Sequence, residues 1–163
     1  MHITFRNDTT NDFFLIVREV AQWLTDDGQE LWAVDTLIAD NLIDEHTRGN
    51  CYVLYVGDIP AATFILQGQS LIYFPDVLPN TAGIIHKLAI RRAFAGRNLF
   101  QFILDFCKDD CLKRGIHEIL LETDATRPAL MRFYERNGFT PTYQKENHEF
   151  GQTFTCQYYV LRF

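Results

Sequence analysis

The stretch that decides the fold is residues 127–139, which read RPALMRFYERNGF. It places a proline where the first turn of a helix tolerates one, and Gly138 at the position where helices commonly end. Phe139 then supplies the apolar contact that often accompanies a helix closed by glycine. The stretch therefore predicts a short helix over residues 128–137.

A further informative stretch lies upstream, where residues 86–99 read HKLAIRRAFAGRNL. The segment 82–90 is β-rich and predicts a strand, and apolar residues recur at helical spacing over residues 99–114. Between them lies a short turn with Gly96 at its centre. A turn of this kind aims backbone N–H groups outward at the start of a helix, and this arrangement is a natural site for an anion.

The sequence outside these two stretches predicts a sheet with helices around it. Helices are expected between residues 11 and 28 and at 36–45, and strands at 3–6, 51–56, 61–66, 71–74, 118–121, 143–145 and 154–161. The strand–helix–strand order over residues 82–121 implies a parallel pair with a right-handed crossover. Hairpins on either side imply antiparallel pairs, the last of them with a polar turn around Asn147. The predicted fold class is α/β in the mixed, α+β sense, with a central, mostly antiparallel sheet flanked by helices.

Composition limits the class of protein. The chain has 163 residues, of which 47% are hydrophobic and 22% charged, and it contains no repeat or linker. These values predict a single domain over residues 1–163. No apolar run approaches the roughly 20 residues that a membrane helix requires. The first residues also lack the basic start and apolar segment of a secretory signal. We therefore expect no membrane association and a cytoplasmic location.

The net charge of −6 disfavours nucleic acid as a partner, because neutralisation of phosphates by Lys and Arg supplies most of the affinity of such proteins. A local basic site for a small phosphate ligand is compatible with this charge. An acidic protein also suits a cationic amine, although the charge does not identify one.

Four cysteines, at positions 51, 107, 111 and 156, form neither a CxxC pair nor a recognisable Cys/His zinc spacing. Cys107 and Cys111 are four residues apart and share a helix face, but nothing nearby completes a metal site. We expect all four to be small core residues and the protein to need no metal.

Together, residues 86–99 and 127–139 resemble the GNAT N-acetyltransferase superfamily. Residues 86–99 resemble the coenzyme A segment of that family, and residues 127–139 are similar to its "x-x-Tyr-Glu-x-x-Gly-Phe" helix and turn. Their separation fits one helix and one strand, and the predicted element order extends the resemblance over nearly all of the chain. The resemblance implies a GNAT-like fold and direct transfer of acetyl from acetyl-CoA to a primary amine.

The resemblance also implies which residues bind the cosubstrate. Residues 95–100 would bind the pyrophosphate with backbone N–H groups; these are Ala95, Gly96, Arg97, Asn98, Leu99 and Phe100. The strand that ends in Leu88, Ala89 and Ile90 would pair with the pantetheine arm. The N–H near Leu88 would polarise the thioester carbonyl. Arg127, where the family commonly has Asn, is a further cofactor-binding candidate.

The turn departs from the family pattern, which usually reads Arg/Gln-x-x-Gly-x-Gly/Ala. Ala95 stands where a basic or amide side chain is usual, Asn98 at the central glycine and Phe100 at the final small residue. Because Asn tolerates a left-handed backbone better than most residues, we expect the turn to form. Phe100 is expected to narrow the pyrophosphate site.

Two residues are the catalytic candidates. Tyr134 occupies the usual general-acid position of the family and would protonate the departing thiolate; its alternative role is that of a core aromatic residue. An amine of Lys type has a pKa of about 10.4, so only about one in 10³ is neutral at pH 7 and a base would help. His86 is the first candidate for that base, and otherwise a strand histidine that packs or hydrogen-bonds. Glu122 and Asp124 are further candidates, unless they cap a helix or are solvated.

The sequence thus favours an N-acetyltransferase whose acceptor is a small-molecule or peptide amine. The alternative within the same family is a module that binds acyl-CoA without turning it over, which the departures at Asn98 and Phe100 favour. A third interpretation is an unrelated α/β protein that binds a phosphate ligand. The aromatic C-terminal strand, residues 154–161, is also compatible with a homodimer.

Overall fold

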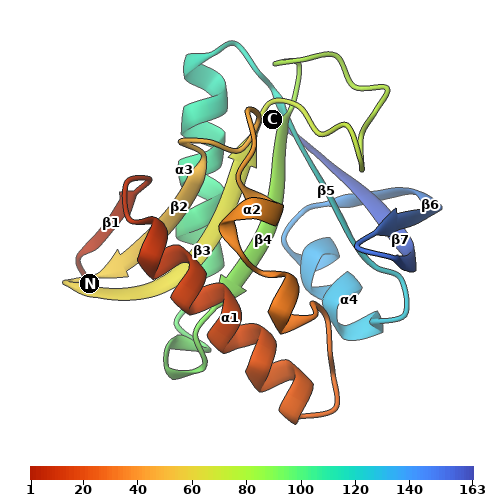
Figure 1. The fold of residues 1–163 in the computed structure, drawn as a ribbon. Coiled ribbons are helices and arrows are strands. Elements are labelled where there is room, and N and C mark those ends of the chain that lie inside the picture. Colours follow the sequence, from red (N-terminus) through yellow and green to blue (C-terminus); the bar gives the residue numbers. More distant parts are fainter. The chain divides into compact units, whose positions relative to one another are not determined.

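Seven strands and four α-helices form along the chain in the computed structural model, which describes residues 1–163. In order, they are β1 (Ile3–Arg6), α1 (Thr10–Asp26), α2 (Ala39–Leu42), β2 (Cys51–Val56), β3 (Ile59–Gln67), β4 (Gly83–Ile90), α3 (Leu99–Lys113), β5 (Glu118–Asp124), α4 (Pro128–Arg136), β6 (Thr140–Glu149) and β7 (Gln152–Arg162) (Figure 1). Two short 3₁₀ turns, η1 (Val34–Thr36) and η2 (Arg92–Phe94), interrupt the loops.

The strands are hydrogen-bonded in the order β1-β2-β3-β4-β5-β7-β6. The pairs β1–β2, β2–β3, β5–β7 and β6–β7 are antiparallel. The pair β4–β5 is parallel, with Gly83 opposite Ile119 and Ile84 opposite Leu120. The predicted fold class, a mixed and mostly antiparallel sheet with helices, is therefore confirmed.

The chain divides into two compact units. Unit 1 contains residues 1–67 and 85–106, and unit 2 contains residues 68–84 and 107–163. Both β4 and α3 contribute residues to each unit. The expectation of a single domain stays a prediction.

In unit 1, helices cover both faces of the strands. The apolar side of α1 packs on β2 and β3 in one buried cluster, which includes Phe13, Ile16, Val17, Val53 and Ile65. Successive side chains of a strand point to opposite faces, so Tyr52 and Phe64 lie on the other side. There the ring of Phe106, on α3, contacts them with centroid distances of 5.0 and 5.8 Å. Within unit 1, α1 and the first half of α3 therefore pack on opposite faces (Figure 1).

In unit 2, β7 presents neighbouring tyrosines to its two faces. Tyr158 packs on Phe74 with a centroid distance of 5.1 Å and stacks on Tyr143 at 4.5 Å. Tyr159 points the other way and lies 6.0 Å from the ring of Tyr134 on α4. The face of β7 that carries Tyr159 is therefore the one that supports α4.

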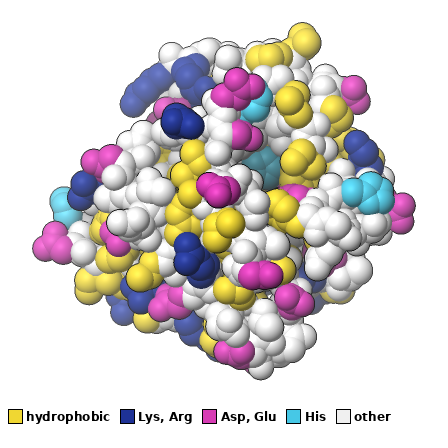
Figure 2. All heavy atoms as spheres, in the orientation of Figure 1, with side chains coloured by type: hydrophobic (Ala, Val, Ile, Leu, Met, Phe, Trp, Pro, Cys, Tyr) yellow, Lys and Arg dark blue, Asp and Glu magenta, His cyan; other side chains and the backbone are white.

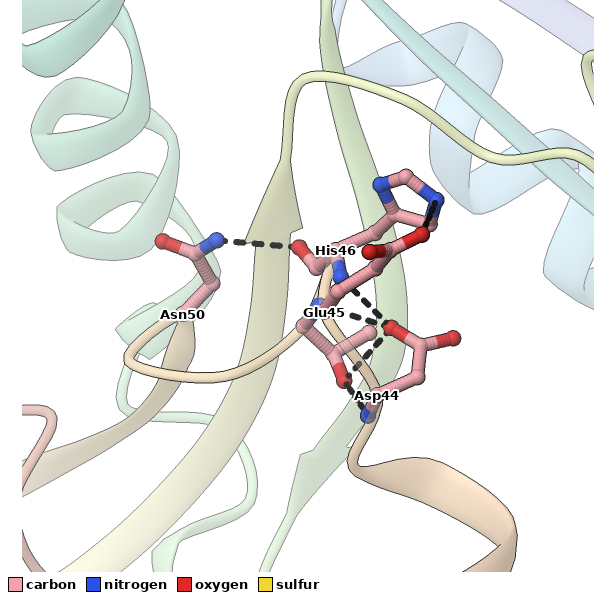
Figure 3. Close-up of polar contacts among 5 residues, drawn as sticks. Asp44, Glu45, His46 and Asn50 are labelled. Carbon is pink, nitrogen blue, oxygen red and sulfur yellow. Dashed lines mark hydrogen bonds and ion pairs between the residues drawn. The ribbon is translucent and has the colours of Figure 1, made fainter.

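The helix expected over residues 36–45 is much shorter than predicted, because α2 covers only Ala39–Leu42. The backbone of Ile38, just before it, is extended. Just after it, Oδ1 of Asp44 accepts hydrogen bonds from the N–H groups of His46 and Thr47 at 2.7 and 3.0 Å (Figure 3). Side chains of this kind offer the backbone an alternative to helical hydrogen bonds, so the turn replaces the predicted second half of the helix.

We expect Asp44→Ala to lower the free energy of unfolding by about 1–2 kcal/mol, because two backbone N–H groups lose their acceptor. Urea denaturation measures this change. The matched control is Glu45→Ala, next along the chain, whose side chain is 85% exposed. The control should shift stability by less than about 0.5 kcal/mol. Equal losses in the two variants would contradict the role assigned to Asp44.

The turn between the last two strands lies further along the chain than predicted. It falls at Phe150 and Gly151, which have φ angles of 50° and 75°. Asn147, the expected turn residue, is buried in β6 and donates a hydrogen bond from Nδ2 to the hydroxyl of Tyr158 at 2.7 Å. In the sequence Asn147 therefore resembled a turn residue, although it lies within a strand and its side-chain amide is hydrogen-bonded there.

Smaller differences concern three other elements. The strand expected at 71–74 is absent, and that segment forms only an isolated bridge between Ser70 and Phe74. The strand expected at 118–121 continues to Asp124, so Glu122 and Asp124 belong to β5 and do not follow it. On α3, Phe102 is 39% exposed although it belongs to the apolar pattern that predicted a helix over residues 99–114.

The four cysteines are free and buried, as predicted for core residues. Burial raises the pKa of the Cys51 and Cys156 thiols to about 11, so both stay protonated near neutral pH. None of the helices has the length and apolar content that crossing a bilayer requires. On the face drawn in Figure 2, Lys and Arg side chains form small separate groups with Asp and Glu nearby.

Candidate active site

An exposed turn connects β4 and η2 to α3. Its four residues, 95–98, are all exposed, whereas Phe94 before it and Leu99 and Phe100 after it are buried. Buried side chains therefore anchor both ends of the turn. Within it, the N–H groups of Ala95 and Arg97 bond to the carbonyls of Arg92 and Phe94 at 3.1 and 3.4 Å. The predicted pyrophosphate-binding residues Ala95, Gly96, Arg97 and Asn98 are contiguous on this surface.

Two residues of the turn have left-handed backbones. The φ angle is 78° at Gly96 and 57° at Asn98. Asn98 therefore adopts the conformation expected where the family usually has glycine. A Cβ atom added to Gly96 would meet nothing within 4 Å, so the backbone conformation, and not lack of space, favours glycine there.

The turn leads directly into the N-terminus of α3. The first N–H groups of a helix have no acceptor within the helix and attract anions. In α3 the N–H of Gln101 bonds to the carbonyl of Asn98 at 3.2 Å, and the N–H groups of Leu99 and Phe100 precede it. The ring of Phe100 is only 3% exposed, and this burial argues against the predicted narrowing of the pyrophosphate site.

Three arginines near the turn have different surroundings. Arg91 is paired with Glu19 of α1 by two hydrogen bonds of 2.6 and 3.0 Å. The guanidinium of Arg92 lies 4.2 Å from the ring centroid of Trp23, also on α1. Arg97 is exposed, and its guanidinium lies 5.0 Å from the ring centroid of Phe94. Among these three, Arg97 is the one carried by the exposed turn itself.

Strand β4 contains a backbone irregularity. Lys87 has a φ angle of 50°, and it is the one residue within a strand among the four non-glycine residues with positive φ. Its carbonyl accepts a hydrogen bond of 3.2 Å from the hydroxyl of Thr63 on β3. Its ammonium lies 5.3 Å from the ring centroid of Trp32. His86 and Leu88, on either side, are half-buried.

Tyr134 lies on α4 among aromatic side chains of unit 2 and is 7% exposed. Its ring centroid is 5.4 Å from that of Phe133 and 5.9 Å from that of Phe139. Burial, with smaller contributions from the charges of Glu122 and Tyr159, raises the pKa of the phenol well above its usual value near 10. The hydroxyl therefore keeps its proton over the whole physiological range.

The two further base candidates lie in different environments. Oδ1 of Asp124 accepts hydrogen bonds from the N–H and the hydroxyl of Thr126, and its other oxygen is 3.4 Å from Nε of Arg127. These contacts fit the structural role weighed for Asp124, at the turn before α4. Glu122, in contrast, is the acid whose charge raises the pKa of Tyr134.

The predicted residues fall in both units. Unit 1 contains His86, residues 88–90 and the turn 95–100, and unit 2 contains Tyr134 and Arg127. The sequence analysis missed the pair Thr63 and Lys87. Thr63 could have been noticed, because it is the one polar residue in the apolar run 61–66. Nothing in the sequence indicated that Lys87 has a left-handed backbone.

Comparison with known proteins connects this geometry to one family. A family model described as "Acetyltransferase (GNAT) family" matches residues 17–139. No curated protein matches the sequence.

Solved structures with this fold include a GNAT family acetyltransferase from Listeria monocytogenes, with a TM-score of 0.72, 17% identity and coverage of 99% of this chain and 95% of that one. The PaiA N-acetyltransferase from Thermoplasma acidophilum, solved with coenzyme A, has a TM-score of 0.68, 13% identity and full coverage of both chains. The ribosomal-protein-S18-alanine N-acetyltransferase from Escherichia coli has a TM-score of 0.64, 19% identity and coverage of 99% and 94%. At these identities the likeness establishes the fold.

Proposed function

The chain belongs to the acetyltransferase (GNAT) family, and from this premise we propose that it transfers the acetyl group of acetyl-CoA to a primary amine by direct attack. The observation that carries the proposal is the exposed turn 95–98. Its two left-handed residues lead into the N-terminus of a 15-residue helix. Such a turn suits the pyrophosphate of coenzyme A, because backbone N–H groups at the start of a helix and the helix dipole both favour negative charge.

The turn and β4 supply the groups for cosubstrate binding. Of residues 95–100, Ala95 and Arg97 already bond their N–H groups to the carbonyls of Arg92 and Phe94 at 3.1 and 3.4 Å, so the other N–H groups of this segment would bind the pyrophosphate. Arg97 would add positive charge, and Arg127 is a further cofactor-binding candidate. The pantetheine arm would pair with the backbone of residues 88–90. These roles use mainly backbone atoms, so the departures of Ala95 and Asn98 from the family pattern leave them intact.

In the proposed reaction the neutral amine nitrogen attacks the thioester carbon, and the Leu88 N–H stabilises the negative charge that develops on the oxygen. The C–S bond then breaks, and the Tyr134 hydroxyl gives its proton to the departing sulfur. His86 would accept the proton that the amine loses. No metal takes part in these steps.

The acceptor is proposed to be a small-molecule or peptide amine. A net charge of −6 favours a cationic acceptor over an anionic one. The E. coli protein of the same fold is named for acetylation of an alanine of ribosomal protein S18, so a peptide amine belongs in any acceptor panel.

The proposed function predicts release of free coenzyme A thiol from acetyl-CoA when a suitable amine is present. The test is a panel of polyamines, aminoglycosides, amino-acid amides and short peptides, with acetyl-CoA alone as control. A thermal shift with coenzyme A but no turnover with any amine would favour the non-catalytic acyl-CoA module. No thermal shift with coenzyme A would overturn both and favour an unrelated phosphate-ligand binder.

A further inference from the structure

We propose that Thr63 is a positioning residue for acetyl transfer. Its hydroxyl orients the peptide group between Lys87 and Leu88, so that the Leu88 N–H is held ready for the thioester oxygen. The inference rests on the proposed function, because the N–H needs orienting only if a thioester reacts beside β4.

The first observation is the burial of Thr63. Its side chain is 0% exposed and lies in the run AATFIL of β3, where the neighbouring side chains are apolar. A hydroxyl at such a position costs stability unless it is hydrogen-bonded. It donates to the carbonyl oxygen of Lys87 at 3.2 Å. The hydroxyl therefore makes a specific bond to β4 that a valine, of the same shape, would lack.

The second observation is the geometry of the peptide group that receives this bond. All peptide bonds of the chain are trans. In a planar trans peptide the C=O of one residue and the N–H of the next point in opposite directions. The C=O of Lys87 points towards Thr63 on β3, so the N–H of Leu88 points away from β3. The bond from Thr63 thus fixes the direction of the proposed oxyanion donor.

The third observation is that this part of β4 is strained. Lys87 has a φ angle of 50°, which is unfavourable for a residue with a side chain. Such a conformation persists only where its surroundings hold it in place. The Thr63 hydroxyl restrains the Lys87 carbonyl, and the ring of Trp32, 5.3 Å from the ammonium, restrains its side chain. Without the hydroxyl, the Lys87–Leu88 peptide group can rotate towards a regular strand.

Rotation of this peptide group would weaken catalysis more than cosubstrate binding. An oxyanion donor acts on charge that develops in the transition state, and removal of a complete donor costs about 10²–10³ in kcat. Loss of one restraint on a donor that is still present should cost less. We expect about a tenfold fall in kcat, with the KM for acetyl-CoA changed by less than about twofold.

The experiment compares Thr63→Val with Thr63→Ser. Valine keeps the shape and removes the hydroxyl, whereas serine keeps the hydroxyl and leaves a small cavity in the core. We expect the valine variant to be slow and the serine variant to retain kcat within about twofold, although serine should have the lower Tm. A purely structural role would make kcat follow Tm. If Thr63→Val does not fold, Thr63→Ala takes its place with the same expected loss of kcat.

Thr47→Val is the control for loss of a buried hydroxyl elsewhere in unit 1. Thr47 is buried and donates to the carbonyl of Leu42 at 2.7 Å, so its replacement should lower Tm and leave kcat unchanged. Wild-type kcat in folded Thr63→Val would overturn the inference and leave the proposed function standing. Absence of turnover in the wild-type protein would overturn both.

Discussion

Tyr134→Phe is expected to lower kcat for acetyl transfer at least tenfold while the affinity for coenzyme A stays within about twofold of wild type. The variant removes one oxygen from a ring that is 7% exposed, and the aromatic packing on Phe133 and Phe139 is kept. What it removes is the proposed proton donor to the departing sulfur, and general acids typically contribute 10²–10⁴-fold. Steady-state kinetics with the best amine of the panel gives kcat, and calorimetry gives the affinity.

The matched control is Tyr55→Phe, which also removes a buried phenol hydroxyl. That hydroxyl donates to Asp12 at 2.5 Å in unit 1. We expect a loss of stability of about 1 kcal/mol from this control, with kcat unchanged. If Tyr134→Phe matched the wild-type rate across the pH range, Tyr134 would have no part in the mechanism.

The raised pKa of Tyr134 shapes the expected pH profile. An unperturbed phenol has a pKa near 10 and a thiol one near 8.5, so complete proton transfer between them is uphill by about 2 kcal/mol. Burial raises the pKa of Tyr134 further, which makes a separate transfer step less favourable still. The proton must therefore move as the C–S bond breaks and the charge on sulfur grows. Because the pKa is raised, ionisation of Tyr134 should cause no fall in kcat below about pH 10.

Features that depend on neighbours in the sequence could be predicted well. Pro128 and Gly138 bracket α4, and the C-terminal Gly138 has a φ angle of 93°. The left-handed conformation of Asn98 was also predictable, because it follows from the local demand of a turn and the tolerance of Asn. The cosubstrate turn is one contiguous stretch, so its residues could be identified together.

Features that depend on partners distant in the sequence could not be predicted. Asn147 resembled a turn residue because its partner, the hydroxyl of Tyr158, comes within hydrogen-bonding distance only once β6 and β7 have paired. Thr63 and Lys87 are 24 residues apart, and their hydrogen bond depends on how β3 and β4 align. The sequence also could not show which of His86, Glu122 and Asp124 acts as the base, because the answer depends on where the acceptor amine lies.

Gly96→Val is expected to raise the Kd for coenzyme A at least tenfold. The φ angle of 78° at Gly96 is strained for any residue with a side chain, and more so for a β-branched one. Since a Cβ at this position meets nothing within 4 Å, the substitution acts through the backbone. The turn would relax towards negative φ, and the N–H groups around position 96 would change direction.

Gly28→Val separates this effect from general destabilisation. Gly28, just after α1, has a φ angle of 74°, and a Cβ there would also meet nothing within 4 Å. The two substitutions therefore impose similar backbone strain and should lower Tm by similar amounts. Only the change at position 96 should weaken coenzyme A binding, as measured by calorimetry. Equal affinities in the two variants would place the pyrophosphate away from the turn, because a binding site made of backbone N–H groups cannot survive a change in the direction of those groups.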